Sequence, residues 1–163
     1  MVLEVGARAP DFTLDGIDGH RYALPDALAS GPVTLIFFKT TCATCDLTFP
    51  YLNRLTSSYS GDGWRLLAIA QDPAEAAREY AQRLGLTFPV LIDQKGYLVS
   101  QLYDPPATPT LFLIEPDRRI AYTTHGFSKD DLNDLSAAIA HRLGVEPQVI
   151  AQRGDGQPDF RPG

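Results

Sequence analysis

The order of apolar and polar residues along the chain predicts strands that alternate with helices. Apolar runs of strand length occupy residues 33–38, 65–70, 88–92 and 110–114. Strands at the centre of a parallel sheet are buried on both faces, so they read as continuous apolar runs of this kind. Helix-like segments separate or follow the runs, at residues 46–59, 72–85, 97–103 and 128–144. The alternation predicts an α/β fold in which helices flank a central sheet.

Turn residues between short apolar segments predict two hairpins. Asp18-Gly19 lies in the middle of residues 12–24, and this dipeptide is typical of a tight hairpin turn. Residues 115–118 connect the segments 110–114 and 119–123 in a similar way. An antiparallel hairpin after strands that are joined through helices makes the predicted central sheet a mixed one.

Capping residues mark the ends of two predicted helices. Asp72 is expected to be the N-cap of a helix with Pro73 at its first position, and Gly85 is expected to end it. Ser128, with Asp131 three residues later, has the spacing of a weak capping box and marks the start of the last helix.

Length and composition predict a single domain with a tail. With 163 residues, of which 44% are hydrophobic, the chain can bury one sizeable core but is too short for two ordinary domains. We therefore expect one domain over residues 1–145. Proline and glycine recur beyond it, and we interpret residues 146–163 as a C-terminal tail.

Charge and hydropathy exclude several classes of partner. The net charge of −6 argues against binding to a nucleic-acid backbone, and no cluster of Lys and Arg offsets it. No apolar stretch approaches the roughly twenty residues that a membrane span needs. The first six residues lack the basic and long apolar parts of a signal peptide. We expect a cytoplasmic monomer; an exported protein whose leader has been removed is the alternative.

The two cysteines of the chain form the motif Cys42-Ala43-Thr44-Cys45. They lie directly after the predicted strand 33–38 and before the predicted helix 46–59. The first sulfur therefore lies where the free N–H groups and the positive end of a helix dipole favour a thiolate. The motif predicts a reactive dithiol.

Two other interpretations of the cysteine pair are weaker. A zinc site would need further Cys or His ligands, but no other cysteine exists and His20, His125 and His141 are isolated from one another. Two buried structural thiols are possible because cysteine is often buried. A chance pair at a strand-to-helix junction would be rare. We expect no metal and no cofactor.

Segments along much of the chain resemble the thioredoxin-like redoxins of the TlpA/ResA type, within the AhpC/TSA-like thioredoxin-fold superfamily. The resemblance is carried by residues 6–14, 41–45, 49–52 and 107–114, and it extends over about residues 3–144. It implies a thioredoxin fold with an extra N-terminal β-hairpin. It also implies thiol–disulfide exchange with a disulfide-containing protein substrate and with an upstream redox partner.

The resemblance assigns roles to individual residues. Cys42 matches the nucleophile, Cys45 the resolving thiol, and Pro109 the cis-proline beside the dithiol. The same order of attack follows from chemistry, because Cys42 lies nearest the helix start whereas Cys45 points into the first turn. The Thr108 backbone is expected to pair with an extended substrate segment. Thr41 belongs to the expected substrate platform, although the family usually has an aromatic residue there.

The sequence departs from the family at two acidic positions. Thioredoxin has a buried acid six positions before its first cysteine, where this chain has Ile36. ResA-like proteins have a glutamate three positions after the second cysteine, where this chain has Thr48. Neither residue can accept a proton, so the route by which Cys45 loses its proton stays open.

Two alternative functions are weighed against disulfide exchange. The segment Ala9-Pro10-Asp11-Phe12 is equally similar to a peroxiredoxin-like thiol peroxidase. Peroxiredoxins need a proline and a Thr or Ser at fixed positions upstream of the peroxidatic cysteine, and neither cysteine here has them. A Sco-like copper chaperone would need a distant histidine near the dithiol. His125 lies beyond the proline loop, so this alternative is the weakest.

Overall fold

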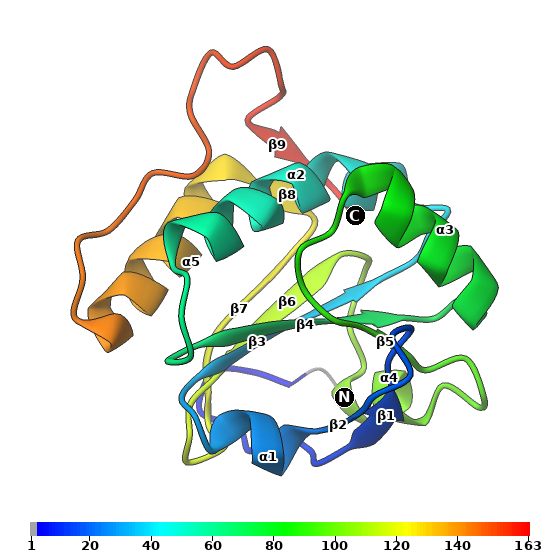
Figure 1. Ribbon diagram of the computed structural model, residues 1–163. Helices are drawn as coiled ribbons and strands as arrows, with labels where there is room; N and C mark the ends of the chain where they lie inside the picture. The colour runs from blue at the N-terminus through cyan, green and yellow to red at the C-terminus, as the bar shows by residue number, and fades with distance from the viewer. Residues whose placement is uncertain (1–2) are drawn as a thin grey trace.

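The computed structural model describes residues 3–163 (Figure 1). Its strands are β1 (Thr13–Asp15), β2 (Arg21–Ala23), β3 (Val33–Phe38), β4 (Arg65–Ala70), β5 (Val90–Ile92), β6 (Thr110–Ile114), β7 (Ile120–His125), β8 (Phe127–Ser128) and β9 (Phe160–Arg161). Its helices are α1 (Leu24–Leu28), α2 (Ala43–Ser58), α3 (Ala74–Leu84), α4 (Leu98–Tyr103) and α5 (Lys129–Leu143). The predicted alternation of strands and helices is confirmed.

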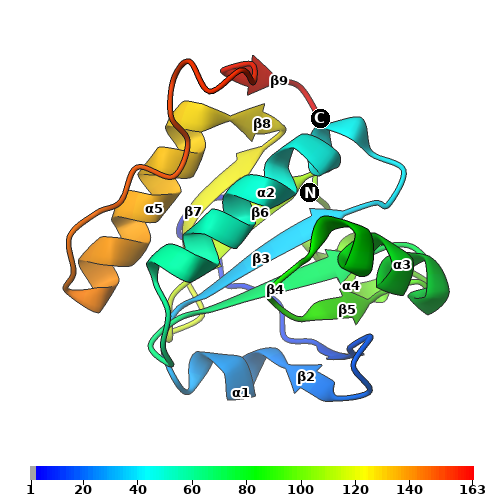
Figure 2. The ribbon, with the colours of Figure 1, turned by 45° about the horizontal axis from the view of Figure 1, so that its top comes forward.

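A five-stranded sheet in the order β5-β4-β3-β6-β7 forms the middle layer. β3 pairs in parallel with β4 and antiparallel with β6, so the sheet is mixed, as predicted. Helices α2, α3 and α5 lie on one face of the sheet, while α1, α4 and the β1–β2 hairpin lie on the other (Figures 1 and 2). β3 is the central strand. The loop that follows it therefore leaves the sheet at the carboxyl end of this strand, midway between the two outer strands.

The side chains of β3 explain why this strand is buried from end to end. Successive side chains of a strand point to opposite faces. Val33, Leu35 and Phe37 pack into the cluster that includes residues of α1 and α4, whereas Ile36 and Phe38 pack into the cluster beneath α2 and α5. Both faces are covered, so the strand has no polar face, and the apolar run 33–38 reflects this.

Both predicted hairpins are present. β1 pairs antiparallel with β2, and the turn includes Gly19 at a φ of 84°, which glycine adopts without strain. β6 pairs antiparallel with β7. At the helix ends, Gly85 and Gly144 both have the left-handed conformation that ends a helix.

The last helix begins as predicted but its capping box is incomplete. The hydroxyl of Ser128 accepts a hydrogen bond from the Asp131 N–H at 3.1 Å. The Asp131 carboxylate does not return to the Ser128 backbone, because it accepts a hydrogen bond from the Thr124 hydroxyl at 2.7 Å. The Asp131 side chain, the second half of the predicted capping box, thus ties α5 to β7.

The prediction that Asp72 caps a helix is wrong. α3 begins after Pro73, which occupies the N-cap position without a side-chain hydrogen bond. The Asp72 carboxylate instead accepts the Thr40 N–H at 2.8 Å. β3 and β4 are parallel neighbours, so the segments that follow them lie close together. Asp72 therefore holds the loop that carries the cysteine motif.

Residues after α5 return across the helical layer. Ile150 and Ala151 are buried, and their backbone N–H groups both donate to the Asn133 side-chain oxygen at 3.0 Å. Farther along, β9 pairs antiparallel with β8. In both views the end of the chain lies at the beginning of α2 (Figures 1 and 2). The segment 146–163 is thus in contact with the domain that precedes it.

Among residues 3–163, no helix combines the length and the apolar character that crossing a membrane would require.

Candidate active site

The cysteine motif lies where β3 passes into α2. α2 begins at Ala43, three residues before the predicted start, and Cys42 is its N-cap. The Cys42 sulfur accepts the Cys45 N–H at 3.1 Å, the bond that a Ser or Asp side chain makes at an ordinary N-cap. A sulfur that receives an N–H bond at a helix start is suited to carry negative charge.

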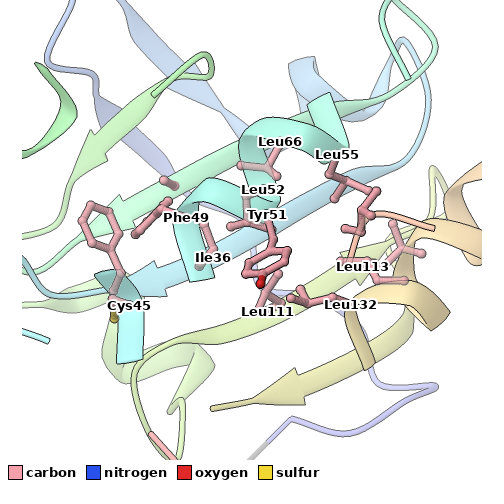
Figure 3. Close-up of a cluster of buried hydrophobic side chains, with 14 of the residues drawn as sticks. Ile36, Cys45, Phe49, Tyr51, Leu52, Leu55, Leu66, Leu111, Leu113 and Leu132 are labelled. Carbon is pink, nitrogen blue, oxygen red and sulfur yellow. The ribbon is translucent and has the colours of Figure 1, made fainter. Parts of the chain in front are cut away.

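The two thiols differ in access to solvent. Both are free cysteines; Cys42 is partly exposed, whereas Cys45 is completely buried. Cys45 and Phe49 of α2 and Ile36 of the central strand belong to one apolar cluster, and Figure 3 labels all three. Only Cys42 is open to a disulfide that arrives from solution.

The loop before β6 closes the other side of the site. The Thr108–Pro109 peptide bond is cis, as the resemblance implies. The Cys42 thiol donates to the Thr108 carbonyl oxygen at 3.4 Å across a separation of 66 residues. The structure therefore brings together Cys42, Cys45, Thr108 and Pro109. Thr41, the remaining predicted site residue, is exposed directly before Cys42.

Burial controls the acidity of the second thiol. Desolvation in the apolar cluster raises the pKa of Cys45 well above its ordinary value, and a hydrogen bond with Cys42 acts in the same direction. A backbone hydrogen bond from Lys39 acts in the opposite direction but is weaker. Cys45 is therefore a poor nucleophile near neutral pH.

The two positions where the resemblance implies acids, Ile36 and Thr48, lie in the interior. Ile36 is completely buried on β3, in the same cluster as Cys45. Thr48 is also completely buried, and its hydroxyl donates to the Thr44 carbonyl of its own helix at 2.8 Å. The carboxylate nearest in sequence, Asp46, is exposed and accepts the Tyr80 hydroxyl at 2.7 Å. The main causes of the raised Cys45 pKa are burial and the neighbouring Cys42, and no carboxylate of the described residues is among these main causes.

Sequence reasoning missed two side chains at this end of the molecule. The Thr44 hydroxyl, inside the motif, donates to the Pro162 carbonyl at 2.8 Å. Lys129, the first residue of α5, is only 1% exposed and contacts residues 152–159. The acidic residues of the tail are a sequence signal for the Lys129 contacts, but their distance from Lys129 along the chain hides the connection. The Thr44 bond goes to a backbone carbonyl, for which the sequence carries no signal.

No group of three or more His, Cys, Asp or Glu that could hold a metal ion occurs within residues 3–163. His125 ends β7 and is exposed.

Comparison with known proteins identifies relatives of the chain. The AhpC/TSA family matches residues 5–123. The thiol-disulfide oxidoreductase ResA of Geobacillus kaustophilus is 35% identical over 130 residues, which cover 78% of this chain and 74% of that protein. ResA of Bacillus subtilis is 30% identical over 122 residues, which cover 74% of this chain and 67% of that protein.

Solved structures support the same relationship. A candidate thiol:disulfide interchange protein DsbE from Chlorobium tepidum superposes with a TM-score of 0.78 at 31% identity and covers 87% of this chain and 99% of its own. Peroxidoxin BcpB from Mycobacterium tuberculosis, with a TM-score of 0.73 at 22% identity over 88% of this chain and 99% of its own, shares the fold alone. The chain thus has a thioredoxin fold with an N-terminal hairpin, belongs to the AhpC/TSA family, and is a thioredoxin-like thiol–disulfide oxidoreductase.

Proposed function

We propose that Cys42 attacks disulfides of protein substrates and that Cys45 resolves the mixed disulfide that results. The observation that supports this order is the difference between the thiols: Cys42 is partly exposed and receives an N–H bond, whereas Cys45 is buried one helical turn away. An attacking thiol must reach its partner, and only Cys42 can do so.

The reaction has two exchange steps. The Cys42 thiolate attacks one sulfur of the substrate disulfide, a Cys42–substrate disulfide forms, and the first substrate sulfur leaves as a thiolate. The Cys45 thiolate then attacks Cys42 Sγ and expels the second substrate sulfur. Two electrons pass to the substrate, each leaving thiolate takes up a proton, and the protein retains a Cys42–Cys45 disulfide.

Substrate binding is assigned to the backbone beside the dithiol. The Thr108 carbonyl is already within 3.4 Å of the Cys42 sulfur, so a chain segment that pairs with Thr108 would place its own disulfide next to Cys42. Thr41, directly before Cys42, is exposed and would contact the same segment. Pro109 is buried and fixes the end of this loop against β6.

The direction of exchange is proposed to be reduction of protein disulfides in the cytoplasm, with an upstream dithiol partner that returns the protein to its reduced form. Cys42, Cys45 and Thr108 suffice for both exchange steps and belong to the same chain, so the proposed reaction requires no second copy and is assigned to a monomer.

Substitution of each cysteine by serine tests these roles. Cys42→Ser is expected to abolish insulin reduction, because no exposed nucleophile remains. Cys45→Ser is expected to accumulate a mixed disulfide between Cys42 and substrate, because only the first step can occur. Mass spectrometry of the intact adducts distinguishes the two, with Thr56→Ser, a change on the same helix far from the motif, as the control. Equal residual turnover in both cysteine variants would contradict the assignment.

A further inference from the structure

The last residues of the chain lie on the surface beside the dithiol. β9 pairs with β8 through Arg161 opposite Phe127 and Phe160 opposite Ser128. The Lys129 N–H continues this pairing, because it donates to the Asp159 carbonyl at 3.0 Å. The red strand β9 and the chain end beyond it run toward the start of α2 in Figure 2. We call residues 160–163 the strap.

The strap contacts the groups that surround Cys42. The Thr44 hydroxyl donates to the Pro162 carbonyl at 2.8 Å, so the strap touches the cysteine motif itself. Gly163 lies so close to the proline loop that a Cβ at this position would be 2.7 Å from the Thr108 oxygen and 2.9 Å from the Ala107 Cβ. The Thr108 oxygen is the atom that accepts the Cys42 thiol. The strap therefore lies against the loop proposed to bind substrate.

A buried lysine anchors the chain that leads to the strap. Lys129 Nζ donates to the carbonyl of Gln152 at 2.9 Å, to that of Gln157 at 3.1 Å and to the Asp155 carboxylate at 2.7 Å. The Tyr51 hydroxyl on α2 donates to the other Asp155 oxygen at 2.5 Å. Lys129 thus fixes residues 152–157 as a loop around one ammonium group.

The strap itself is held by much less. Residues 152–163 are all exposed, whereas Ile150 and Ala151 before them are buried. A hollow of about 390 Å³ lies between α2 and part of the tail, and it is lined by side chains of both, among them Asp46, Tyr51, Arg54, Asp155 and Arg161. Of the strap, Arg161 lines this hollow. The strap is attached by the two-residue ladder, by the Thr44 hydroxyl and by close packing against Gly126 and the proline loop. All of these contacts are at the surface, so the strap can leave while its anchor stays.

We propose that the strap occupies the docking surface for an extended segment of the protein substrate, and that substrate must displace it to reach Cys42. This inference rests on the proposed function. An extended segment that binds here would add to the edge of β8 and accept the Thr44 hydroxyl through a backbone carbonyl, as Pro162 does. Thr44 is thereby a substrate-binding residue, and the partner is an unfolded or flexible chain that can adopt a strand.

Competition between strap and substrate predicts selectivity by size. Occupancy of a site by its own chain lowers the apparent affinity for a competitor in proportion to the fraction of molecules that are open. A small disulfide needs only the partly exposed Cys42 sulfur and is unaffected. A protein disulfide needs the surface that the strap covers and is slowed.

Two variants that release the strap by different means test this inference. Lys129→Met removes the anchor, and Gly163→Val places a Cβ where the Thr108 oxygen leaves no room. Insulin and the small disulfide dithiobisnitrobenzoate serve as substrates. In both variants the ratio of the insulin rate to the small-disulfide rate is expected to rise, roughly three- to tenfold if the strap is closed in most molecules. Arg142→Met on α5 and Glu146→Val at an exposed position of the tail before the anchored loop are the matched controls and are expected to leave the ratio unchanged.

An unchanged or lower ratio in Gly163→Val, which alters an exposed residue and cannot disturb the core, would overturn the inference. Hydrogen exchange provides a second measurement on the full chain. In a Cys45→Ser mixed disulfide with a cysteine-containing peptide, the backbone N–H groups of Phe160 and Arg161 are expected to exchange faster, because a displaced strap no longer pairs with β8; unchanged protection of these two residues would show that strap and substrate bind side by side. If the proposed function itself fails, neither substrate is reduced in any variant, which distinguishes the two failures.

Discussion

At the scale of single residues, the unusual feature of the site is a resolving thiol without an acid to accept its proton. Burial in the apolar cluster raises the pKa of Cys45, while Ile36 and Thr48 occupy the two positions where the resemblance to thioredoxin and to ResA-like proteins implies carboxylates. A thiol must be ionised to attack, so a raised pKa leaves little Cys45 thiolate at neutral pH, and the fraction grows as the pH rises toward that pKa.

Resolution is therefore expected to be slow at pH 7 and to accelerate with increasing pH. Thr48→Glu should speed resolution near pH 7 because a carboxylate beside Cys45 can accept its proton. The change should lower the free energy of unfolding by roughly 1–3 kcal/mol, because it buries a polar group and removes the Thr48–Thr44 hydrogen bond. The measurement is the decay of a Cys42 mixed disulfide across pH.

Thr48→Gln is the matched control for Thr48→Glu, since glutamine has nearly the same size as glutamate but cannot take up the proton. If wild type and Thr48→Glu give the same pH profile while both are folded, then Thr48 is not at the relay position or proton transfer does not limit the step.

At the scale of elements, the junction of β8 and α5 joins the tail to the domain. Ser128 ends β8, caps α5 through its hydroxyl, and faces Phe160 of β9. The Asp131 N–H donates to the Ser128 hydroxyl, and the Asp131 carboxylate links α5 to Thr124 on β7. One short segment thus sets the start of a helix, the edge of a small sheet and the base of the strap.

Loss of the Ser128 cap should lower the stability of the protein by a measurable amount. Ser128→Ala is expected to lower the free energy of unfolding by about 1 kcal/mol, because the Asp131 N–H loses its acceptor. Urea unfolding followed by far-UV circular dichroism measures the change. Ser57→Ala is the control, since the Ser57 hydroxyl donates only to carbonyls of its own helix and should have little effect. A loss that is no larger than the control's would show that the cap is replaced by water.

At the scale of the whole molecule, the fold does not by itself choose between disulfide exchange and peroxide reduction. The same architecture is shared with peroxidoxin BcpB at a TM-score of 0.73. Function depends on the site placed on the fold. Here the residues upstream of Cys42 at the positions that a peroxidatic cysteine needs are Leu35 and Lys39, neither of which supplies the required proline or hydroxyl.

Hydrogen peroxide should consequently oxidise Cys42 slowly, near the rate of an ordinary thiolate. Stopped-flow measurement of the reduced protein mixed with peroxide gives this rate, and the Cys42→Ser variant gives the background. A rate many orders of magnitude above that of a free thiolate would make peroxide reduction the main activity.

The sequence alone determined the features that depend on neighbours along the chain. The run 33–38 predicted a buried strand because its residues are apolar on both faces, and Gly85 and Gly144 predicted helix ends because they adopt left-handed backbone readily. The motif Cys42 to Cys45 predicted a dithiol because a helix start places its two sulfurs within one turn.

Only the tertiary structure decided which distant groups meet at the dithiol. Asp72 reaches Thr40 rather than its own helix because β3 and β4 are adjacent in the sheet. The Thr44 hydroxyl donates to the Pro162 carbonyl across 118 residues, and the Lys129 ammonium donates to backbone carbonyls of the tail. Periodicity and spacing report the environment within a few turns of one element, whereas these contacts depend on how the elements pack, which no local pattern encodes.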